Sequence, residues 1–175
     1  MDEFDIEQAD NKDYVLSMVK QDGKLLDLAS KRLQDDEEIV IEAVRQNPIS
    51  LEFASNRLKN DARIVMESVS RVGWTACYAS EKLRANKEIM LPGLKIDGQI
   101  LYYVSKELRD DKEAVLAAVT NKGLILKYAS NRLRQDKDIV LAAIKQDKRA
   151  KEYIASEELK NDEDIQLILN PPQEN

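Results

Sequence analysis

The sequence contains no histidine, and only one cysteine, five glycines and four prolines occur among its 175 residues. Without histidine, the commonest general base and transition-metal ligand are missing, which excludes Ser-His-Asp triads, Cys-His dyads and histidine-containing zinc sites. Cys77 by itself forms neither an internal disulfide nor a CxxC pair, so we expect a reducing compartment. No GxGxxG, Walker or EF-hand loop is present. We therefore expect no enzymatic activity, no catalytic residue, no metal and no cofactor.

Long apolar runs are missing as well. Charged residues interrupt every apolar stretch before it reaches the ~20 residues that span a bilayer. The first residues, Met1–Asp5, are rich in acid where a secretory signal requires basic residues. The chain has 27 Lys and Arg against 33 Asp and Glu, a net charge of −6 that speaks against a nucleic-acid partner. These features predict a cytoplasmic protein that contacts neither membranes nor nucleic acids.

What the sequence does contain is a repeat of 25 residues, which lengthens to 26 in its last step. Three sets of positions recur in phase. A small residue precedes a serine at Ala29, Ala54, Ala79, Val104, Ala129 and Ala155. Leucine recurs at Leu33, Leu58, Leu83, Leu108, Leu133 and Leu159. Aspartate or asparagine recurs at Asn11, Asp36, Asp61, Asn86, Asp111, Asp136 and Asp162. Agreement among three independent sets makes chance an implausible explanation.

The pattern inside each unit predicts two helices. In the fifth unit Asp111 is a suitable N-cap, an acid follows in the first turn, and apolar residues continue to residue 119. A turn is expected at Gly123, because glycine adopts the left-handed conformation that closes a helix. The second helix is expected over residues 124–133, with Leu126, Ala129 and Leu133 on one face. Helices of about 10 residues are unstable alone, so neighbouring units must stack.

The predicted architecture is an all-α, solenoid-like array of about six 25-residue helical hairpins plus a C-terminal capping helix at residues 162–169. We expect a polar N-terminal tail at residues 1–10, the helical-repeat array at residues 11–169 and a C-terminal tail at residues 170–175. The two prolines of the last segment cannot continue a helix.

The unit resembles a known family of short helical repeats. The resemblance rests on Tyr-Ala-Ser-x-x-Leu at Tyr128–Leu133 and Asp-Lys-Glu at Asp111–Glu113, and it extends over residues 11–169. It identifies the repeat as similar to the domain of unknown function four-one-one-six. The resemblance implies a helical array without an established activity, and it alone raises the option of delivery into a host cell.

Pro92 and Gly93 interrupt the fourth unit where its first helix is expected. Proline in mid-helix removes a backbone donor and costs about 3 kcal/mol, so we expect a kink or a shortened helix. Either the repeat has simply degenerated here, or the irregularity bends the array or opens a groove beside Tyr102.

The charged positions have an explanation in helix termini. Cations end each second helix, at Lys59, Arg84, Arg109, Arg134 and Lys160, and acids begin each first helix. Since one turn joins the two sites, we expect these charges to line one edge and largely to neutralise each other.

Variable positions on the second helix are the best candidates for function, because stacking does not fix them. Trios such as 74/77/81 and 99/102/106 share one exposed face, with aromatic and apolar residues at its centre. The candidate partner-binding residues are Ile49, Trp74, Cys77, Tyr102, Leu124 and Lys127. The alternative for Trp74 is local packing over the turn between the two helices.

Three functional hypotheses follow. The first is a non-catalytic helical-repeat scaffold that binds another protein, or another domain of a parent chain, through the exposed face of the second helices. The second is a structural spacer or regulatory arm of a larger multidomain protein. The third and weakest is an enzyme that works without histidine.

Overall fold

The computed structural model describes residues 4–172 as a single row of helical repeats, with no β-strand in that range. The longer α-helices are α1 (Lys12–Gln21), α2 (Glu37–Gln46), α3 (Ala62–Val69), α5 (Lys87–Ile96), α7 (Lys112–Asn121), α8 (Lys137–Gln146) and α10 (Glu163–Leu169). Six of them are followed by a 3₁₀ helix: η2 (Gly23–Leu28), η4 (Pro48–Phe53), η6 (Gly73–Tyr78), η7 (Gly98–Tyr102), η8 (Gly123–Tyr128) and η10 (Lys148–Tyr153).

A short helical turn then leads into the next repeat. This turn is 3₁₀ in η3 (Leu33–Asp35), η5 (Leu58–Asn60) and η9 (Leu133–Gln135). It is α-helical in α4 (Glu81–Arg84), α6 (Lys106–Arg109) and α9 (Glu157–Lys160).

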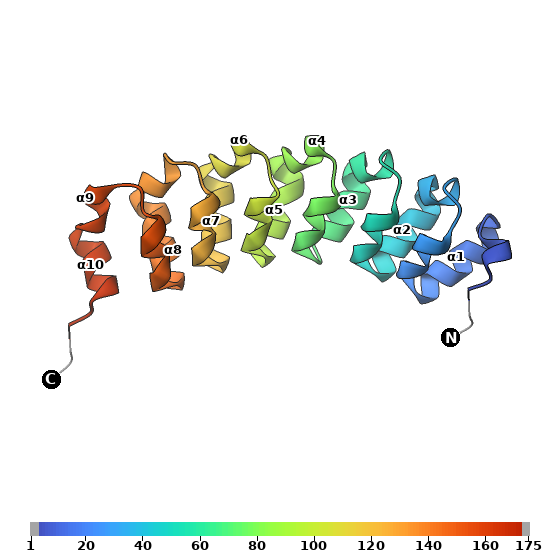
Figure 1. Cartoon of the computed structure of the whole chain (residues 1–175), viewed down its shortest axis with the longest axis horizontal. Helices are drawn as coiled ribbons and strands as arrows, with labels where there is room; N and C mark the ends of the chain where they lie inside the picture. Colours follow the sequence, from blue (N-terminus) through green and yellow to red (C-terminus); the bar gives the residue numbers. More distant parts are fainter. Residues whose placement is uncertain (1–3, 173–175) are drawn as a thin grey trace.

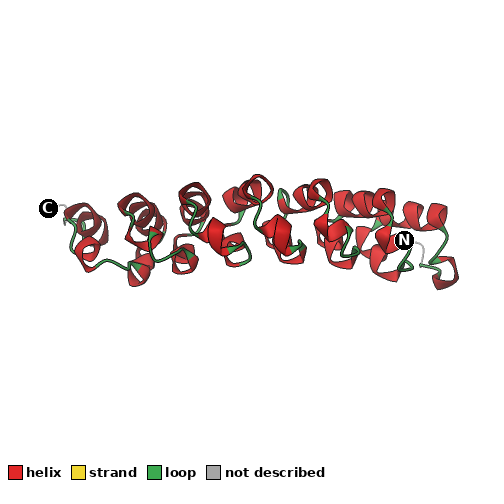
Figure 2. Cartoon of the chain, turned by 90° about the horizontal axis from the view of Figure 1, so that it is seen from above, coloured by secondary structure: helices red, strands yellow, loops and turns green. Residues whose placement is uncertain are grey.

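The repeats stand side by side in an arch (Figure 1). The short helices α4, α6 and α9 lie along its outer edge, and the long α-helices run from there to the inner edge. Seen from above, the helices form two rows (Figure 2). The hydrophobic core runs between the rows along the whole array. The predicted all-α solenoid is therefore confirmed.

The apolar positions predicted to form the seam are buried. Leu126 and Leu133 are fully buried, and Ala129 is 7% exposed. The last helix, α10, packs against α8 and buries Ile165 completely, as a C-terminal capping helix should.

The predicted start of each long helix is also correct. The side chain of Asp111 accepts a hydrogen bond from the amide of Ala114 at 2.9 Å. Asp36 accepts from the amides of Glu38 and Ile39 at 3.0 and 3.2 Å. The N-cap aspartates therefore satisfy donors that have no partner inside the helix.

The second helix differs from the prediction of one ten-residue α-helix. In the fifth repeat it is the 3₁₀ helix η8, which ends at Tyr128. The next residue, Ala129, has an extended backbone with φ −65° and ψ 156°. The reason is the contact with the preceding repeat: the amide of Ser130 donates to the carbonyl of Arg109 at 2.9 Å. The Ser130 hydroxyl then accepts from the amide of Leu133 and begins a new turn.

The turn glycines differ from the prediction as well. No residue of the described chain has a positive φ, so glycine does not close these helices in the left-handed conformation. Instead, a Cβ added to Gly123 would lie 2.2 Å from the carbonyl oxygen of Ala143 in the next repeat. Glycine is needed here because two backbones touch.

Pro92 does not shorten its helix, so the second of the two predicted outcomes, a kink or a shortened helix, is wrong. Helix α5 spans ten residues with Pro92 inside it, the same length as α7. The lost hydrogen bond concerns the carbonyl of Glu88, which is an exposed residue, so water can solvate that carbonyl. Gly93 fits closely against the third repeat, since an added Cβ would lie 2.5 Å from Val69 Cγ1.

The segment expected to be an N-terminal tail contains η1 (Ile6–Gln8). Phe4 packs edge-on against Tyr14, with ring centroids 5.4 Å apart. The amide of Asp5 donates to the Tyr14 hydroxyl at 2.6 Å. This segment therefore covers the start of the array. Of the expected C-terminal tail, residues 170–172 are not helical, and residues 173–175 lie outside the described chain.

Candidate functional site

The candidate residues lie on the solvent side of the 3₁₀ helices η4, η6, η7 and η8, which we call the 3₁₀ face. A 3₁₀ helix has three residues per turn, so side chains three positions apart lie directly above one another. Trp74 and Cys77 are such a pair on η6, and Leu124 and Lys127 are another on η8. The exposed set predicted from a 3.6-residue period thus shares one face for a different reason.

Three candidates come together around Tyr102. Its ring is 52% exposed and lies 5.1 Å from that of Tyr103 and 5.0 Å from that of Tyr128, centroid to centroid. The Lys127 ammonium lies 4.8 Å from the centroid of Tyr128, in a cation–π arrangement. Tyr102, Leu124 and Lys127 line one groove of about 320 Å³.

The other three candidates lie farther along the face. Trp74 is 38% exposed, and its ring packs edge-on against Tyr78 at 5.8 Å. It therefore both packs locally and presents apolar surface to solvent. Cys77 and Ile49 are half-buried. Within residues 4–172 no ring contact links Trp74 to Tyr102.

The groups around Cys77 have altered acidities. Burial, and then the nearby Glu52 carboxylate, raise the pKa of the Cys77 thiol, so it stays protonated at neutral pH. Burial and a hydrogen bond with Glu52 raise the pKa of Tyr78 to about 12. Burial lowers the pKa of Lys59.

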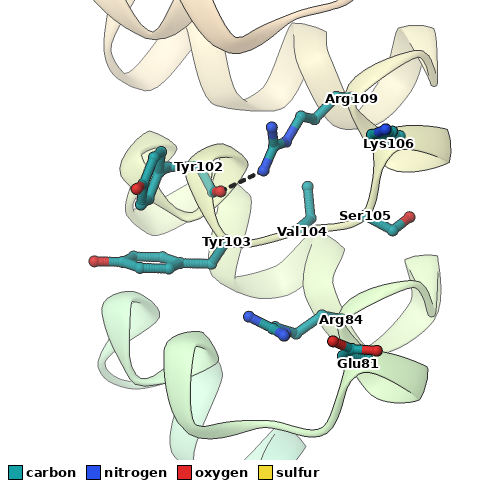
Figure 3. A pocket seen from close by; sticks show the side chains of 8 residues that line it. All are labelled: Glu81, Arg84, Tyr102, Tyr103, Val104, Ser105, Lys106 and Arg109. Carbon is teal, nitrogen blue, oxygen red and sulfur yellow. Dashed lines mark hydrogen bonds between the residues drawn. The ribbon is translucent and has the colours of Figure 1, made fainter.

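A larger cavity of about 720 Å³ lies between the third and fourth repeats. Figure 3 shows Tyr103 between the side chains of Arg84 and Arg109, which point to the same side as the tyrosine. One guanidinium nitrogen of Arg109 donates to the carbonyl of Tyr102 at 2.6 Å. Lys106 and Glu81 complete the charged lining.

The expected mutual neutralisation of charges is wrong for these arginines. The acids at the helix starts pair with a lysine of the preceding repeat: Lys112 lies 2.9 Å from Asp136 and 2.7 Å from Asp138. The same arrangement joins Lys87 to Asp111 at 2.9 Å. Of the five cations predicted at the ends of the second helices, Lys160 pairs with Glu157 at 2.6 Å. The other four are Lys59, Arg84, Arg109 and Arg134, which we call the cation row; within residues 4–172 none of them forms an ion pair.

The regular spacing of the cation row is visible in the sequence, but the absence of carboxylate partners for these cations is not. A pairing between residues 24 to 26 positions apart appears only after the repeats stack. An apolar area on the opposite side was not predicted from the sequence either; Leu116 and Ala117 line one hollow there, and Leu141 and Ala142 line the next.

Three kinds of polar contact join most neighbouring repeats. One is the lysine–acid pairing just described. Another is a clamp in which Asp110 accepts from the Ser130 hydroxyl and from Arg132 Nε. The third is an amide bridge, in which Asn121 accepts from the Gly98 amide at 2.9 Å and donates to the Ile96 carbonyl at 3.2 Å.

The junction between the third repeat (residues 61–85) and the fourth (residues 86–110) lacks all three. Ala62 replaces the lysine, Ala85 replaces the clamp aspartate and Ile96 replaces the amide. The described residues show no side-chain hydrogen bond across it; the amide of Ser105 donates to the carbonyl of Arg84 at 3.1 Å. The cavity of about 720 Å³ and the exposed Tyr102 thus adjoin the least clamped junction of the arch.

Two further features of the described residues bear on function. Among residues 4–172 no three acidic or cysteine side chains are grouped as a metal ion would require. In the same range every helix is too short or too polar to cross a bilayer.

Comparison with known proteins gives one match. The family model described as Domain of unknown function (DUF4116) matches three consecutive segments, residues 11–59, 61–109 and 111–154. Each segment covers about two structural repeats. No significant match was found among curated proteins or among solved structures.

Proposed function

The chain belongs to DUF4116, a family of helical repeats, and from this premise we propose that it is a non-catalytic scaffold that binds another protein. The partner is a separate protein or another domain of a parent chain. The binding surface is the 3₁₀ face around Tyr102 and Trp74.

The exposure of large aromatic side chains on one face carries this proposal. Tyr102 and Trp74 are 52% and 38% exposed, respectively, whereas the equivalent positions Lys24 and Asp27 of the first repeat are polar. Aromatic residues beside a groove supply most of the binding energy in many protein interfaces. The half-buried Leu124 and the Lys127 stem extend the apolar lining around Tyr102.

The test is quantitative affinity capture with matched variants. The Trp74→Ala/Tyr102→Ala double variant is compared with wild type and with Leu116→Ala, whose side chain is 38% exposed on the opposite side. If Trp74 and Tyr102 are binding hot spots, their loss should weaken the affinity for a specific partner by about ten-fold or more. We expect specific partners to be lost from the double variant and retained by Leu116→Ala.

Retention of every partner by the double variant, with unchanged affinity, would reject the 3₁₀ face as the binding surface. The second candidate function, a structural spacer or regulatory arm, predicts this result. It also predicts that the fluorescence of Trp74, the only tryptophan, does not shift with any partner. The observation that favours this second candidate is the packing of Trp74 against Tyr78, which gives the tryptophan a structural role.

A further inference from the structure

The cation row differs from the lysines at the starts of the long α-helices, which are all paired. Its members, Lys59, Arg84, Arg109 and Arg134, hold equivalent positions in four successive repeats and are half-buried. In contrast, Lys12, Lys87, Lys112 and Lys137 each bind two carboxylates of the next repeat. A half-buried cation without a carboxylate has lost part of its hydration without gaining a partner.

The arginines also have unused donors. The Nε atoms of Arg84, Arg109 and Arg134 are buried and have no acceptor within the described chain. Arg109 uses one terminal nitrogen on the Tyr102 carbonyl, and Arg134 makes one long bond of 3.4 Å to Asn131. Guanidinium groups with free donors are suited to carboxylates, which they bind in pairs of hydrogen bonds.

The surroundings favour an anionic ligand. The cavity between the third and fourth repeats contains three cations, Arg84, Lys106 and Arg109, and one carboxylate, Glu81. This local excess of positive charge contrasts with the net charge of −6 of the whole chain. Tyr103 lies between the two arginines and offers a flat apolar surface to a chain laid across it (Figure 3).

Spacing distinguishes between anionic ligands. Packed helical layers lie about 8–10 Å apart, and an extended peptide rises ~3.3 Å per residue, so one repeat corresponds to about three peptide residues. A peptide with an acid at every third position therefore matches the row. A nucleic-acid strand carries a phosphate about every 3.4 Å in a duplex, so a row with one cation per repeat would leave most of its phosphates unpaired.

We propose that the cation row binds an extended acidic segment of the protein partner, with one carboxylate for each of the four cations. This inference rests on the proposed function, since the acidic segment would run beside Tyr102 on the 3₁₀ face. It adds the chemistry of the partner, which the exposed aromatic residues do not specify.

The test uses a dye-labelled peptide with glutamate at every third position, about 12 residues long so that it spans four repeats. Binding is measured by fluorescence anisotropy. Controls are the same peptide with glutamine in place of glutamate and an oligothymidylate of equal charge. We expect the glutamate peptide to bind with an affinity that falls as salt is added, and the two controls to bind at least about ten-fold more weakly.

Matched protein variants locate the site. Arg84→Gln/Arg109→Gln should weaken the glutamate peptide by about ten-fold or more. Arg32→Gln/Arg132→Gln removes the same charge from the clamps on the outer edge and should leave the affinity within about two-fold. If the first variant does not fold, Arg84→Lys/Arg109→Lys keeps the charge but loses the paired geometry, and should still bind more weakly than wild type.

Equal binding of the glutamate and glutamine peptides, no binding of either, or tighter binding of oligothymidylate would overturn this inference. So would an equal loss in both double variants. These outcomes leave the Trp74/Tyr102 capture experiment to decide the proposed function separately. The capture experiment can fail while peptide binding still depends on Arg84 and Arg109. In that case the 3₁₀ face is rejected as the binding surface, and the cation row is retained as an acidic-peptide site.

Discussion

Glycine at the turns of this protein is required by distance rather than by backbone dihedral angles. An added Cβ would lie 2.2 Å from the Ala43 carbonyl oxygen at Gly23 and 2.3 Å from that of Ala118 at Gly98. Both contacts are far below the van der Waals separation, and backbone atoms cannot rotate away. One missing methyl group thus sets how closely two repeats approach.

Replacement of Gly123 by alanine is expected to destabilise the protein by about 1–3 kcal/mol, because the new methyl group would overlap the Ala143 backbone. Urea unfolding measures the effect. The matched control is Lys148→Ala, since Lys148 holds the equivalent place in the sixth repeat and is exposed. This control should change stability by less than about 0.5 kcal/mol. Equal midpoints for Gly123→Ala and wild type would contradict the steric explanation.

The raised pKa of Tyr78 predicts a loss of stability in alkali. An exposed tyrosine has a pKa of about 10, whereas burial and Glu52 raise that of Tyr78 to about 12. The folded state therefore holds the phenol proton more tightly than the unfolded state. Its contribution is complete below about pH 10 and is lost as the pH rises towards 12.

Unfolding of wild type and Tyr78→Phe across this pH range measures the contribution. The variant should show a shallower decline of stability with pH, and its ultraviolet titration should lack the most alkaline tyrosinate step. Tyr102→Phe is the control, because that side chain is 52% exposed. Identical slopes for wild type and Tyr78→Phe would contradict the assignment.

At the scale of elements, the clamp correlates with whether the short turn after the serine of each repeat is 3₁₀ or α-helical. Where aspartate, serine and arginine are all present, the turn is 3₁₀, as in η9 after Ser130. Arg132 also donates to the Asp110 carbonyl at 2.5 Å. After Ser105 the partners are replaced by Ala85 and Glu107, and the turn is the α-helix α6. A contact with the preceding repeat thus accompanies the local conformation.

A substitution should supply one of the polar contacts that the junction between the third and fourth repeats lacks; we call it the bare junction. In Ile96→Gln, the new amide should accept from the free Gly73 amide, as Asn121 does from Gly98. One hydrogen bond of this kind adds about 1 kcal/mol to the free energy of unfolding. Leu116→Gln is the control, because it removes exposed apolar surface from the same row of α-helices without facing a turn glycine. An equal change in thermal unfolding temperature for both variants would exclude a specific bridge.

For the whole molecule, stability is the sum of the repeats and of the junctions between them. Lysine–acid pairs, clamps or amide bridges support most other junctions of the described chain. The junction between the second and third repeats has other polar contacts, from Ser80 to Asn60 and from Arg71 to the carbonyl of Arg45. The junction at residues 85–86 depends on apolar packing, such as Ile100 against Gly73 and Val69 against Gly93, and on one backbone hydrogen bond between Ser105 and Arg84. The arch is therefore unevenly reinforced, with its weakest polar connection near the middle.

Hydrogen exchange should reveal this unevenness. We expect faster amide exchange in α5 beside the bare junction than in α7, although both helices are central and ten residues long. Mass spectrometry of peptides from the two helices in the native protein measures the difference. Ile96→Gln should slow exchange in α5 more than in α7. Equal protection of the two helices in wild type would show that packing alone makes the junctions equivalent.

The sequence by itself determined the period, the number of repeats, the N-caps and the buried seam. These features depend on residues a few positions apart: Asp111 caps Ala114 three residues later, and Leu126, Ala129 and Leu133 share a face within one unit. Short-range interactions of this kind are repeated in every unit, so the pattern is visible along the chain. The shared face of the six candidate site residues was predicted as well, but from a 3.6-residue period rather than from the three-residue period of the 3₁₀ helices.

Only the tertiary structure decided the type of the second helix, the reason for the glycines and the pairing of the charges. Each of these depends on a neighbour 20 to 26 residues away, such as Ala143 for Gly123 or Asp138 for Lys112. From their equal spacing along the chain, the lysines and arginines of the repeats cannot be told apart as to which will form an ion pair. Stacking provides the acids to the lysines at the helix starts and leaves the cation row without them, because an ion pair forms only where two side chains are brought within reach.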